Sequence, residues 1–376
     1  MRIGFDITAI PRAKSGVGFY VLNLLKALAE IDRENDYYIF SKKEDQLLVD
    51  FDANSFNIIP CSTSNRLLRL GWEQILLPRY ISRHKLEVFH SPHYTVPLKS
   101  KIPTITTIHD LTFFTHPDVH EKSKVIFFRQ MIPLAARRAD AVIAVSENTK
   151  KDAVKFLDLP ESKIHVVYEG VDTSLYRPLK QDQKLNLIKE RYGLKKDFIL
   201  FVGTLEPRKN IDGVIRAFWQ VAKETEGQYN LVVTGTKGWN YQSIFTLVQE
   251  LNLQEDVRFT GYVPEEDLPY LFNAATVFVY PSFYEGFGIP PLEAMACGTP
   301  VIASNVSSLP EVVGDGGLLV DPGNIDEIAE SIVRVLTFED LRGQLARKGR
   351  ERAQLFSWQR AAQKTLDIYN LVAGNK

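Results

Sequence analysis

Two glutamates eight positions apart, Glu285 and Glu293, carry the most chemical information in this 376-residue sequence. They flank a turn ending in Pro290-Pro291, and an apolar run, 276–280, precedes them. Prolines at this point can only begin a helix, so we expect a strand, a loop holding Glu285, and a helix with Glu293 in its first turn. The N–H groups of a helix start suit phosphate, and carboxylates suit hydroxyl groups. The pattern therefore predicts a sugar nucleotide as ligand, although Glu293 could simply complement the helix dipole and Glu285 could be a solvated loop charge.

A basic pair, Arg208-Lys209, follows the apolar run 198–202 and precedes Asn210, a good N-cap for a helix from Ile211. Two cations at such a junction can neutralise a departing diphosphate without a metal. A solvated basic pair is the alternative, but the position after a strand favours phosphate binding.

Gly16 and Gly18 follow the first apolar run and open a helix, where they permit close backbone approach to a ligand. Val21 stands where the dinucleotide fingerprint requires a third glycine. This difference argues against a nicotinamide enzyme.

His109 follows the predicted strand 104–108, next to Asp110. A histidine at a strand end can hydrogen-bond a sugar hydroxyl or act as a general base near neutral pH. The sequence leaves both roles open, together with an ordinary structural one.

Metal ligands are few. Asp50-Phe51-Asp52 is a D-x-D triplet that could hold a divalent metal, but its charged surroundings are more typical of a surface loop. Cys61 and Cys297 are the only cysteines and lie far apart, so they form neither a disulfide framework nor a clustered thiol site. We expect no metal and no cofactor.

The segments that carry the candidate site residues all follow predicted strands. Strands alternate with amphipathic helices along the chain, and this alternation indicates parallel α/β sheets. The predicted strands are 2–7, 37–40, 57–61, 88–90, 104–108, 141–145, 164–167, 198–202, 231–234, 257–260, 276–280, 300–303 and 317–320. The predicted helices include 18–30, 67–83, 122–138, 211–224, 241–251, 266–274 and 292–296. The fold class is α/β, with two doubly wound Rossmann-like domains, 1–172 and 173–357, that face each other across a cleft. A single larger domain, with Pro178 in a loop, is the alternative.

A net charge of −1 argues against a nucleic-acid binder. An early acidic residue, Asp6, argues against a secretory signal, and no apolar run is long enough to span a bilayer. We therefore expect a cytoplasmic protein, at most peripheral to the inner face of the membrane. Two basic groups, in 66–101 and 122–138, are either solvated faces or contacts for anionic lipid or acceptor.

The chain resembles glycosyltransferase family 4, retaining enzymes of the GT-B fold. The resemblance is carried by Glu285 to Glu293, by Ala296-Cys297-Gly298-Thr299-Pro300, by Gly203 to Asn210, by Gly170-Val171-Asp172, and by Pro310 to Pro322. In the first half it rests on Gly16-Val17-Gly18 and His109-Asp110.

The resemblance implies roles for residues of the second half. Glu293 would bind the ribose hydroxyls and Glu285 the transferred sugar. Arg208 and Lys209 would hold the diphosphate, helped by the backbone amides of Phe287, Gly288 and Ile289.

It also implies that Gly16 and Gly18 lie in the donor-phosphate loop, that His109 touches the donor sugar near its reacting face, and that the backbone at Val263 meets the base. The helix 358–376 would pack back onto the first domain.

The segment 203–210 looks most like mannosyltransferases that build bacterial polysaccharides such as O-antigen. GDP-mannose is therefore the expected donor, with a glycan or lipid-linked acceptor. A UDP-sugar donor and a sugar-nucleotide epimerase of the same fold remain alternatives, and the sequence leaves acceptor, linkage position and oligomeric state open.

Overall fold

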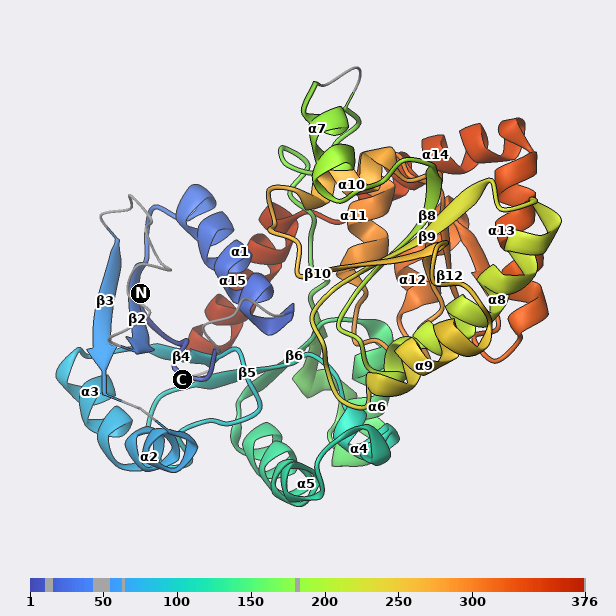
Figure 1. Cartoon of the computed structure of the whole chain (residues 1–376). Coiled ribbons are helices and arrows are strands. Elements are labelled where there is room, and N and C mark those ends of the chain that lie inside the picture. Colours follow the sequence, from blue (N-terminus) through green and yellow to red (C-terminus); the bar gives the residue numbers. More distant parts are fainter. Residues whose placement is uncertain (11–15, 43–54, 63–64, 180–182, 375–376) are drawn as a thin grey trace. The chain divides into compact units, whose positions relative to one another are not determined.

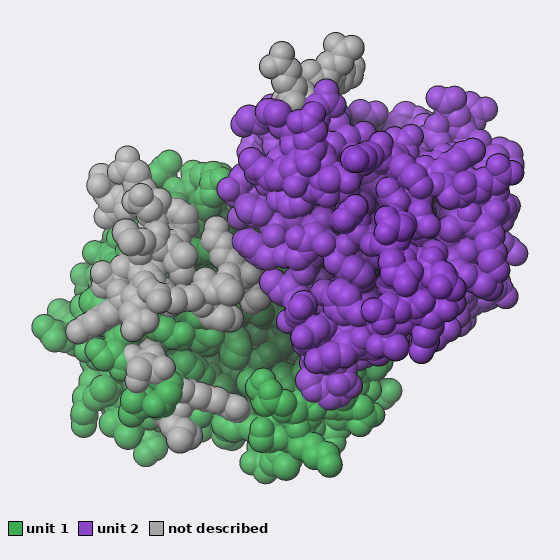
Figure 2. Space-filling model, in the orientation of Figure 1, with its two compact units in different colours: residues 1–170, 358–376 green, residues 171–357 purple. Residues whose placement is uncertain are grey.

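The computed structural model describes residues 1–10, 16–42, 55–62, 65–179 and 183–374. The chain forms two compact units, which Figure 2 shows in different colours. Unit 1 comprises Met1–Gly170 together with Trp358–Lys376, and unit 2 comprises Val171–Ser357.

Unit 1 contains a seven-stranded, entirely parallel sheet with the order β3-β2-β1-β4-β5-β6-β7. The three strands 88–91, 104–108 and 141–144 are buried along their whole length, as is typical of a parallel sheet with helices on both faces. The strands are β1 (Arg2–Asp6), β2 (Asp36–Lys42), β3 (Phe56–Cys61), β4 (Val88–Ser91), β5 (Thr104–Ile108), β6 (Ala141–Ala144) and β7 (Ile164–Val166).

The helices of unit 1 include one from the far end of the sequence, α15, which packs against α1 (Figure 1). The helical elements are α1 (Gly16–Ile31), α2 (Arg66–Gly71), η2 (Trp72–Leu76), α3 (Leu77–Arg83), α4 (Thr112–Thr115), η3 (Pro117–Val119), α5 (Lys122–Arg138), α6 (Glu147–Leu157), η4 (Glu161–Lys163) and α15 (Trp358–Gly374).

Unit 2 contains a six-stranded parallel sheet with the order β10-β9-β8-β11-β12-β13. The strands are β8 (Asp197–Val202), β9 (Tyr229–Thr234), β10 (Val257–Gly261), β11 (Val277–Tyr280), β12 (Val301–Ser304) and β13 (Leu318–Val320). The helical elements are α7 (Gln183–Arg191), η5 (Pro207–Lys209), α8 (Ile211–Glu224), α9 (Gln242–Glu250), α10 (Leu268–Ala274), α11 (Ile289–Cys297), α12 (Leu309–Val313), η6 (Gly314–Gly316), α13 (Ile325–Thr337) and α14 (Glu339–Ala353).

The predicted fold class, two parallel α/β sheets of Rossmann type, is confirmed. One predicted helix, 67–83, is interrupted by the π-helical turn η2. The wider turn brings two polar side chains onto the loop after β4: Glu73 accepts from Thr95 at 2.7 Å, and Gln74 donates to the Val96 carbonyl at 2.9 Å. Buried hydrogen bonds to the loop therefore outweigh regular helix geometry here.

Candidate functional site

The carboxylate of Glu285 lies within a polar cluster at the carboxyl edge of the unit 2 sheet. Nζ of Lys209 donates to Glu285 Oε1 at 2.6 Å and to the Tyr280 hydroxyl at 2.5 Å. The Tyr280 hydroxyl donates to the same carboxylate oxygen at 3.0 Å, and Arg208 Nη1 lies 3.0 Å from Oε2. These side chains follow or end β8 and β11, the neighbouring strands between which the strand order reverses. Such a switch point is where doubly wound sheets bind ligands.

The charges in this cluster are mutually dependent. Burial alone would raise the pKa of Glu285, but Arg208 and Lys209 outweigh it and hold that pKa at about 2. Burial lowers the pKa of Lys209, and the Glu285 carboxylate opposes this by stabilising the ammonium. Burial, together with Glu285, raises the pKa of Tyr280 well above its usual range. At neutral pH the cluster therefore contains an ionised carboxylate and an un-ionised phenol.

Arg208 is held at three points. Besides Glu285, its guanidinium donates to the Tyr284 carbonyl at 2.6 Å and to Glu206 at 2.6 Å. The side chain is only 16% exposed. It is thus fixed in orientation before any ligand arrives.

The predicted N-cap role of Asn210 is wrong. Asn210 does precede α8, but its backbone is left-handed and its side chain makes no capping hydrogen bond. Its amide instead donates to the carbonyls of Pro281 at 3.1 Å and Pro322 at 2.7 Å. It ties together the loops after β8, β11 and β13, because those buried carbonyls require a donor.

Glu293 lies on α11 as its fifth residue, since the helix begins at Ile289 rather than later. Its carboxyl group is half-buried and hydrogen-bonded to the Tyr176 hydroxyl. Burial, reinforced by Glu265, raises the pKa of Glu293 to about 8, although the hydrogen bond from Tyr176 works in the opposite direction. Glu285 and Glu293 therefore have opposite protonation states at pH 7, set by their surroundings.

The loop between the two glutamates positions the start of α11. The hydroxyl of Ser308 donates to the carbonyls of Glu285 at 2.9 Å and Phe287 at 2.7 Å. Gly288, the residue before α11, has φ +112°, and a Cβ there would lie 2.6 Å from Leu309. Only glycine fits this position. Pro290 and Pro291 have no N–H, so Ile289 has the first N–H of α11, the kind of group that binds phosphate at a helix start.

Val263 lies two residues beyond β10 and is buried. It stands on the same sheet edge as Glu285, because every strand of this sheet is parallel.

In unit 1, His109 directly follows β5 and is 7% exposed. Its Nε2 lies 3.1 Å from the Pro92 carbonyl, and its Nδ1 lies 3.5 Å from Glu169 Oε1. The ring of Tyr20 contacts the imidazole edge-on, with centroids 4.7 Å apart. Both ring nitrogens thus face protein acceptors.

Gly16 and Gly18 lie in the first turn of α1. A Cβ on Gly18 would lie 3.3 Å from Ile10, whereas Gly16 is exposed and has no atom that close. Close packing therefore explains why position 18 is a glycine, but it does not explain the glycine at position 16.

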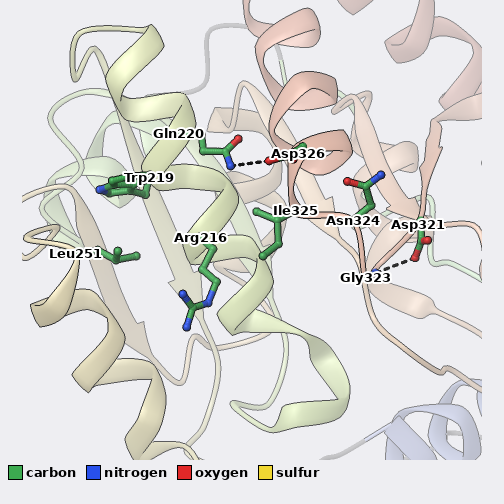
Figure 3. A pocket seen from close by; sticks show the side chains of 9 residues that line it. All are labelled: Arg216, Trp219, Gln220, Leu251, Asp321, Gly323, Asn324, Ile325 and Asp326. Carbon is green, nitrogen blue, oxygen red and sulfur yellow. Dashed lines mark hydrogen bonds between the residues drawn. The ribbon is translucent and has the colours of Figure 1, made fainter.

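One hollow of unit 2 contains none of the predicted site residues (Figure 3). It is a cavity of about 770 Å³ on the helical side of the unit, lined by Arg216, Trp219, Gln220, Leu251, Asp321, Gly323, Asn324, Ile325 and Asp326. Its loop, 321–324, is joined to the loop after β8 by the hydrogen bond from the Asn210 amide to the Pro322 carbonyl. Chemistry therefore favours the Glu285 cluster over this cavity as the reactive site.

Within the described ranges, no three His, Cys, Asp or Glu side chains lie close enough together to bind a metal. Asp50 and Asp52 lie outside those ranges. Among the helices that the structure describes, none is both long and apolar enough to cross a bilayer.

Sequence reasoning missed several polar partners of the site: Glu206, Tyr280, Tyr176 and Glu169. The apolar pattern assigns Tyr280 to a strand and to no other role. A tyrosine at the end of a buried strand, directly before a loop that carries site residues, is nevertheless recognisable as a candidate site residue. No sequence pattern marks Tyr176 or Glu169 as a site residue, since their contacts depend on tertiary structure.

Two family profiles match the sequence. The profile described as Glycosyltransferase Family 4 matches residues 14–175, and that described as Glycosyl transferases group 1 matches residues 182–352. The O-antigen chain mannosyltransferase B of Escherichia coli is 33% identical over 383 aligned positions, covering 99% of this chain and 100% of that protein. The O-antigen chain mannosyltransferase RfbU of Salmonella typhimurium is 30% identical, covering 85% and 90%.

Solved structures share the fold along the whole chain. Sucrose-phosphate synthase from Thermosynechococcus elongatus matches with a TM-score of 0.81 at 24% identity, covering 100% of both chains. Anabaena HepE in complex with UDP and glucose matches with a TM-score of 0.76 at 19% identity, covering 98% and 99%. With its two matching profiles and a relative that it covers in full, the chain belongs to glycosyltransferase family 4, as a group 1 glycosyltransferase of the GT-B fold.

Proposed function

We propose that this chain is a retaining mannosyltransferase that takes mannose from GDP-mannose and adds it to a growing glycan or lipid-linked saccharide. The observation that carries the proposal is the full-length similarity to a protein named as an O-antigen chain mannosyltransferase. The polar cluster of unit 2 supplies what such a reaction needs, namely fixed cations for a diphosphate and carboxylates for hydroxyl groups.

Each side chain then has a task in binding the donor. Arg208 and Lys209 hold the diphosphate together with the backbone amides of Phe287, Gly288 and Ile289. Glu285 orients those cations and accepts from the transferred sugar. Glu293 accepts from the ribose, and the backbone at Val263 meets the base. On unit 1, His109 touches the donor sugar, and Gly16 and Gly18 belong to the phosphate loop.

The transfer proceeds on one face of the sugar. The bond from the anomeric carbon to the diphosphate oxygen breaks, and the acceptor oxygen bonds to that carbon from the same side. The acceptor proton passes to the departing diphosphate. The surroundings of Glu285 support this route over a double displacement, because three donors already engage its carboxylate and leave it a poor nucleophile.

A donor panel tests the function. The purified enzyme is incubated with GDP-mannose, GDP-glucose, UDP-glucose and UDP-galactose plus a mannose-terminated acceptor, and both released nucleotide and product are measured. We expect turnover with GDP-mannose and an α-linked product by NMR. Preference for a UDP-sugar would overturn the donor, isomerised sugar nucleotide would indicate an epimerase, and an inverted anomer or a covalent glycosyl-enzyme on Glu285 would overturn the mechanism.

We further propose that the enzyme needs no metal, because Arg208 and Lys209 can neutralise the diphosphate. We also propose that it works at the cytoplasmic membrane surface. Helix α5 supports the membrane contact, because exposed Ile126 and Leu134 lie on one side of it between the basic residues Lys122 and Arg137. Apolar side chains ringed by cations suit anionic lipid headgroups. Sedimentation with phosphatidylglycerol vesicles should exceed that with phosphatidylcholine at low salt and decline as salt rises; equal sedimentation would overturn the idea.

A further inference from the structure

Ser308 directly precedes α12, in the position of the helix N-cap. A serine there normally accepts a hydrogen bond from an N–H group of its own helix. The side chain of Ser308 makes no such bond to α12. Its hydroxyl instead donates to the loop before α11, at 2.9 Å from the Glu285 carbonyl and 2.7 Å from the Phe287 carbonyl. The side chain therefore stabilises that loop rather than the helix it precedes.

The residues on either side of Ser308 hold the same loop. Oγ of Ser307 accepts from the Glu285 N–H at 3.0 Å. The backbone of Ser307 has φ +56°, in the left-handed region that residues other than glycine seldom adopt. Leu309 lies against Gly288, where a Cβ would be only 2.6 Å from the leucine side chain. The loop is thus fastened both by hydrogen bonds and by packing.

The bond to the Phe287 carbonyl determines where the next N–H points. The peptide group between Phe287 and Gly288 is trans, so its C=O and its N–H point in opposite directions. Because the carbonyl faces Ser308, the Gly288 N–H faces away from Ser308. Gly288 is buried, yet among the described residues none accepts a hydrogen bond from this N–H. A buried N–H in this situation needs an acceptor, and an anionic oxygen can be one.

The hydroxyl of Ser308 has no ready substitute. It carries one hydrogen, which the carbonyls of Glu285 and Phe287 share. Ser308 is 0% exposed, so bulk water cannot take the place of a deleted hydroxyl. A change at position 308 should therefore alter the orientation of the peptide group that follows Phe287.

We propose that Ser308 is a positioning residue for the diphosphate of the donor. By holding the Phe287 carbonyl, it directs the Gly288 N–H toward the diphosphate before the ligand arrives. Such a preorganised donor stabilises charge without having to reorient when the ligand binds. The inference rests on the proposed function, in which the amides of Phe287, Gly288 and Ile289 contact the diphosphate. Ser308 acts on the phosphates and not on the nucleoside.

The peptide group in question can be observed by itself. Phe287-Gly288 is the only Phe-Gly pair in the sequence. Protein labelled with carbon-13 at the phenylalanine carbonyl and with nitrogen-15 in glycine therefore gives one correlated signal, from this peptide group. Inorganic pyrophosphate is the probe, because it has the diphosphate without base or sugar. We expect pyrophosphate to shift the wild-type signal, and its dissociation constant to rise about tenfold in Ser308→Ala.

Comparing nucleotide with nucleoside separates positioning from a general loosening of the site. GDP should bind Ser308→Ala about tenfold more weakly than the wild type, whereas guanosine, which lacks phosphates, should change by less than about twofold. Thr299→Val is the matched control. Thr299 is 4% exposed and donates to the Phe272 carbonyl at 2.7 Å. Its loss should lower the melting temperature without changing the affinity for pyrophosphate.

A wild-type signal that does not respond to pyrophosphate would overturn the proposal. Unchanged pyrophosphate affinity in Ser308→Ala would do the same, as would equal losses for GDP and guanosine. Should Ser308→Ala fail to fold, Ser308→Cys replaces it; a thiol donates more weakly than a hydroxyl, so pyrophosphate affinity must still fall.

The proposed donor is tested separately. If the wild type binds UDP rather than GDP, the GDP-mannose assignment fails, and the comparison is made with UDP and uridine. The pyrophosphate measurements involve no base, so they decide the role of Ser308 in either case.

Discussion

Replacing Glu293 with glutamine should change how the stability of the protein depends on pH. The pKa of Glu293 in the folded state is about 8 and its ordinary value is 4.5. Between these values the folded state keeps a proton that the unfolded state has released. The free energy of unfolding therefore falls as pH rises through this window and levels off above pH 8. Glutamine does not titrate, so Glu293→Gln should lack this contribution.

The size follows from the pKa difference. At 1.36 kcal/mol per pKa unit, the upper bound is about 5 kcal/mol. Glu293 is only half-buried, and solvent screening reduces the effect, so we expect about 1–3 kcal/mol between pH 5 and 8. Urea unfolding of both proteins at pH 5, 6, 7 and 8 measures it, because other titrating groups cancel in the difference. A wild-type-minus-variant difference that stays constant across this range would refute the reasoning.

The same carboxyl group links pH to nucleotide binding. If Glu293 accepts from the ribose as a carboxylate, GDP binding at pH 7 must release the proton it holds. Affinity should then rise by up to about tenfold per pH unit between pH 6 and 8. The heat of GDP binding to the wild type, measured by calorimetry, should differ between phosphate and Tris buffers, because the buffer takes up the released proton. The same measurement on Glu293→Gln gives the part of this difference that comes from protons on the phosphates of GDP. Equal heats in both buffers would show that no proton leaves.

Three further outcomes test the cluster. Arg208→Ala and Lys209→Ala should each lower kcat by roughly a hundredfold or more, measured by nucleotide release, since each removes a fixed charge stabiliser. Tyr280→Phe should lower the free energy of unfolding by about 1 kcal/mol and also reduce kcat, because Lys209 loses one of its two partners; an unchanged kcat would restrict Tyr280 to a structural role. Turnover should persist in EDTA; loss that Mg²⁺ restores would direct attention to Asp50 and Asp52.

The alternation of short, largely apolar runs and amphipathic helices predicted both sheets, because strands that are buried on both faces are rich in apolar residues whatever their order. Strand order was not readable, however. Nothing in the sequence states that β8 lies beside β11, and that adjacency is what brings Lys209 to Glu285, 76 positions away. The sequence therefore identifies these site residues one by one, but not which of them contact each other.

The polar partners were hidden for a related reason. The contact of Glu169 with His109 joins residues 60 positions apart, and the bond between Tyr176 and Glu293 joins residues 117 positions apart. The cap expected of Asn210 failed because buried carbonyls from two distant loops competed for its amide. Local conformational preferences of the sequence contain no information about partners so distant along the chain.

Helix α15 has a consequence for how this protein is made. It packs on α1, and the Tyr369 hydroxyl bonds the buried His90, yet all of residues 171–357 separates it from the rest of unit 1. At roughly 5–20 residues per second, a ribosome needs on the order of ten to forty seconds to synthesise that intervening stretch. During this time the side of α1 that α15 will cover is open to water in the nascent first unit, and Nδ1 of His90 lacks the Tyr369 hydroxyl. Unit 2, by contrast, is continuous in sequence and is available in full before α15 emerges.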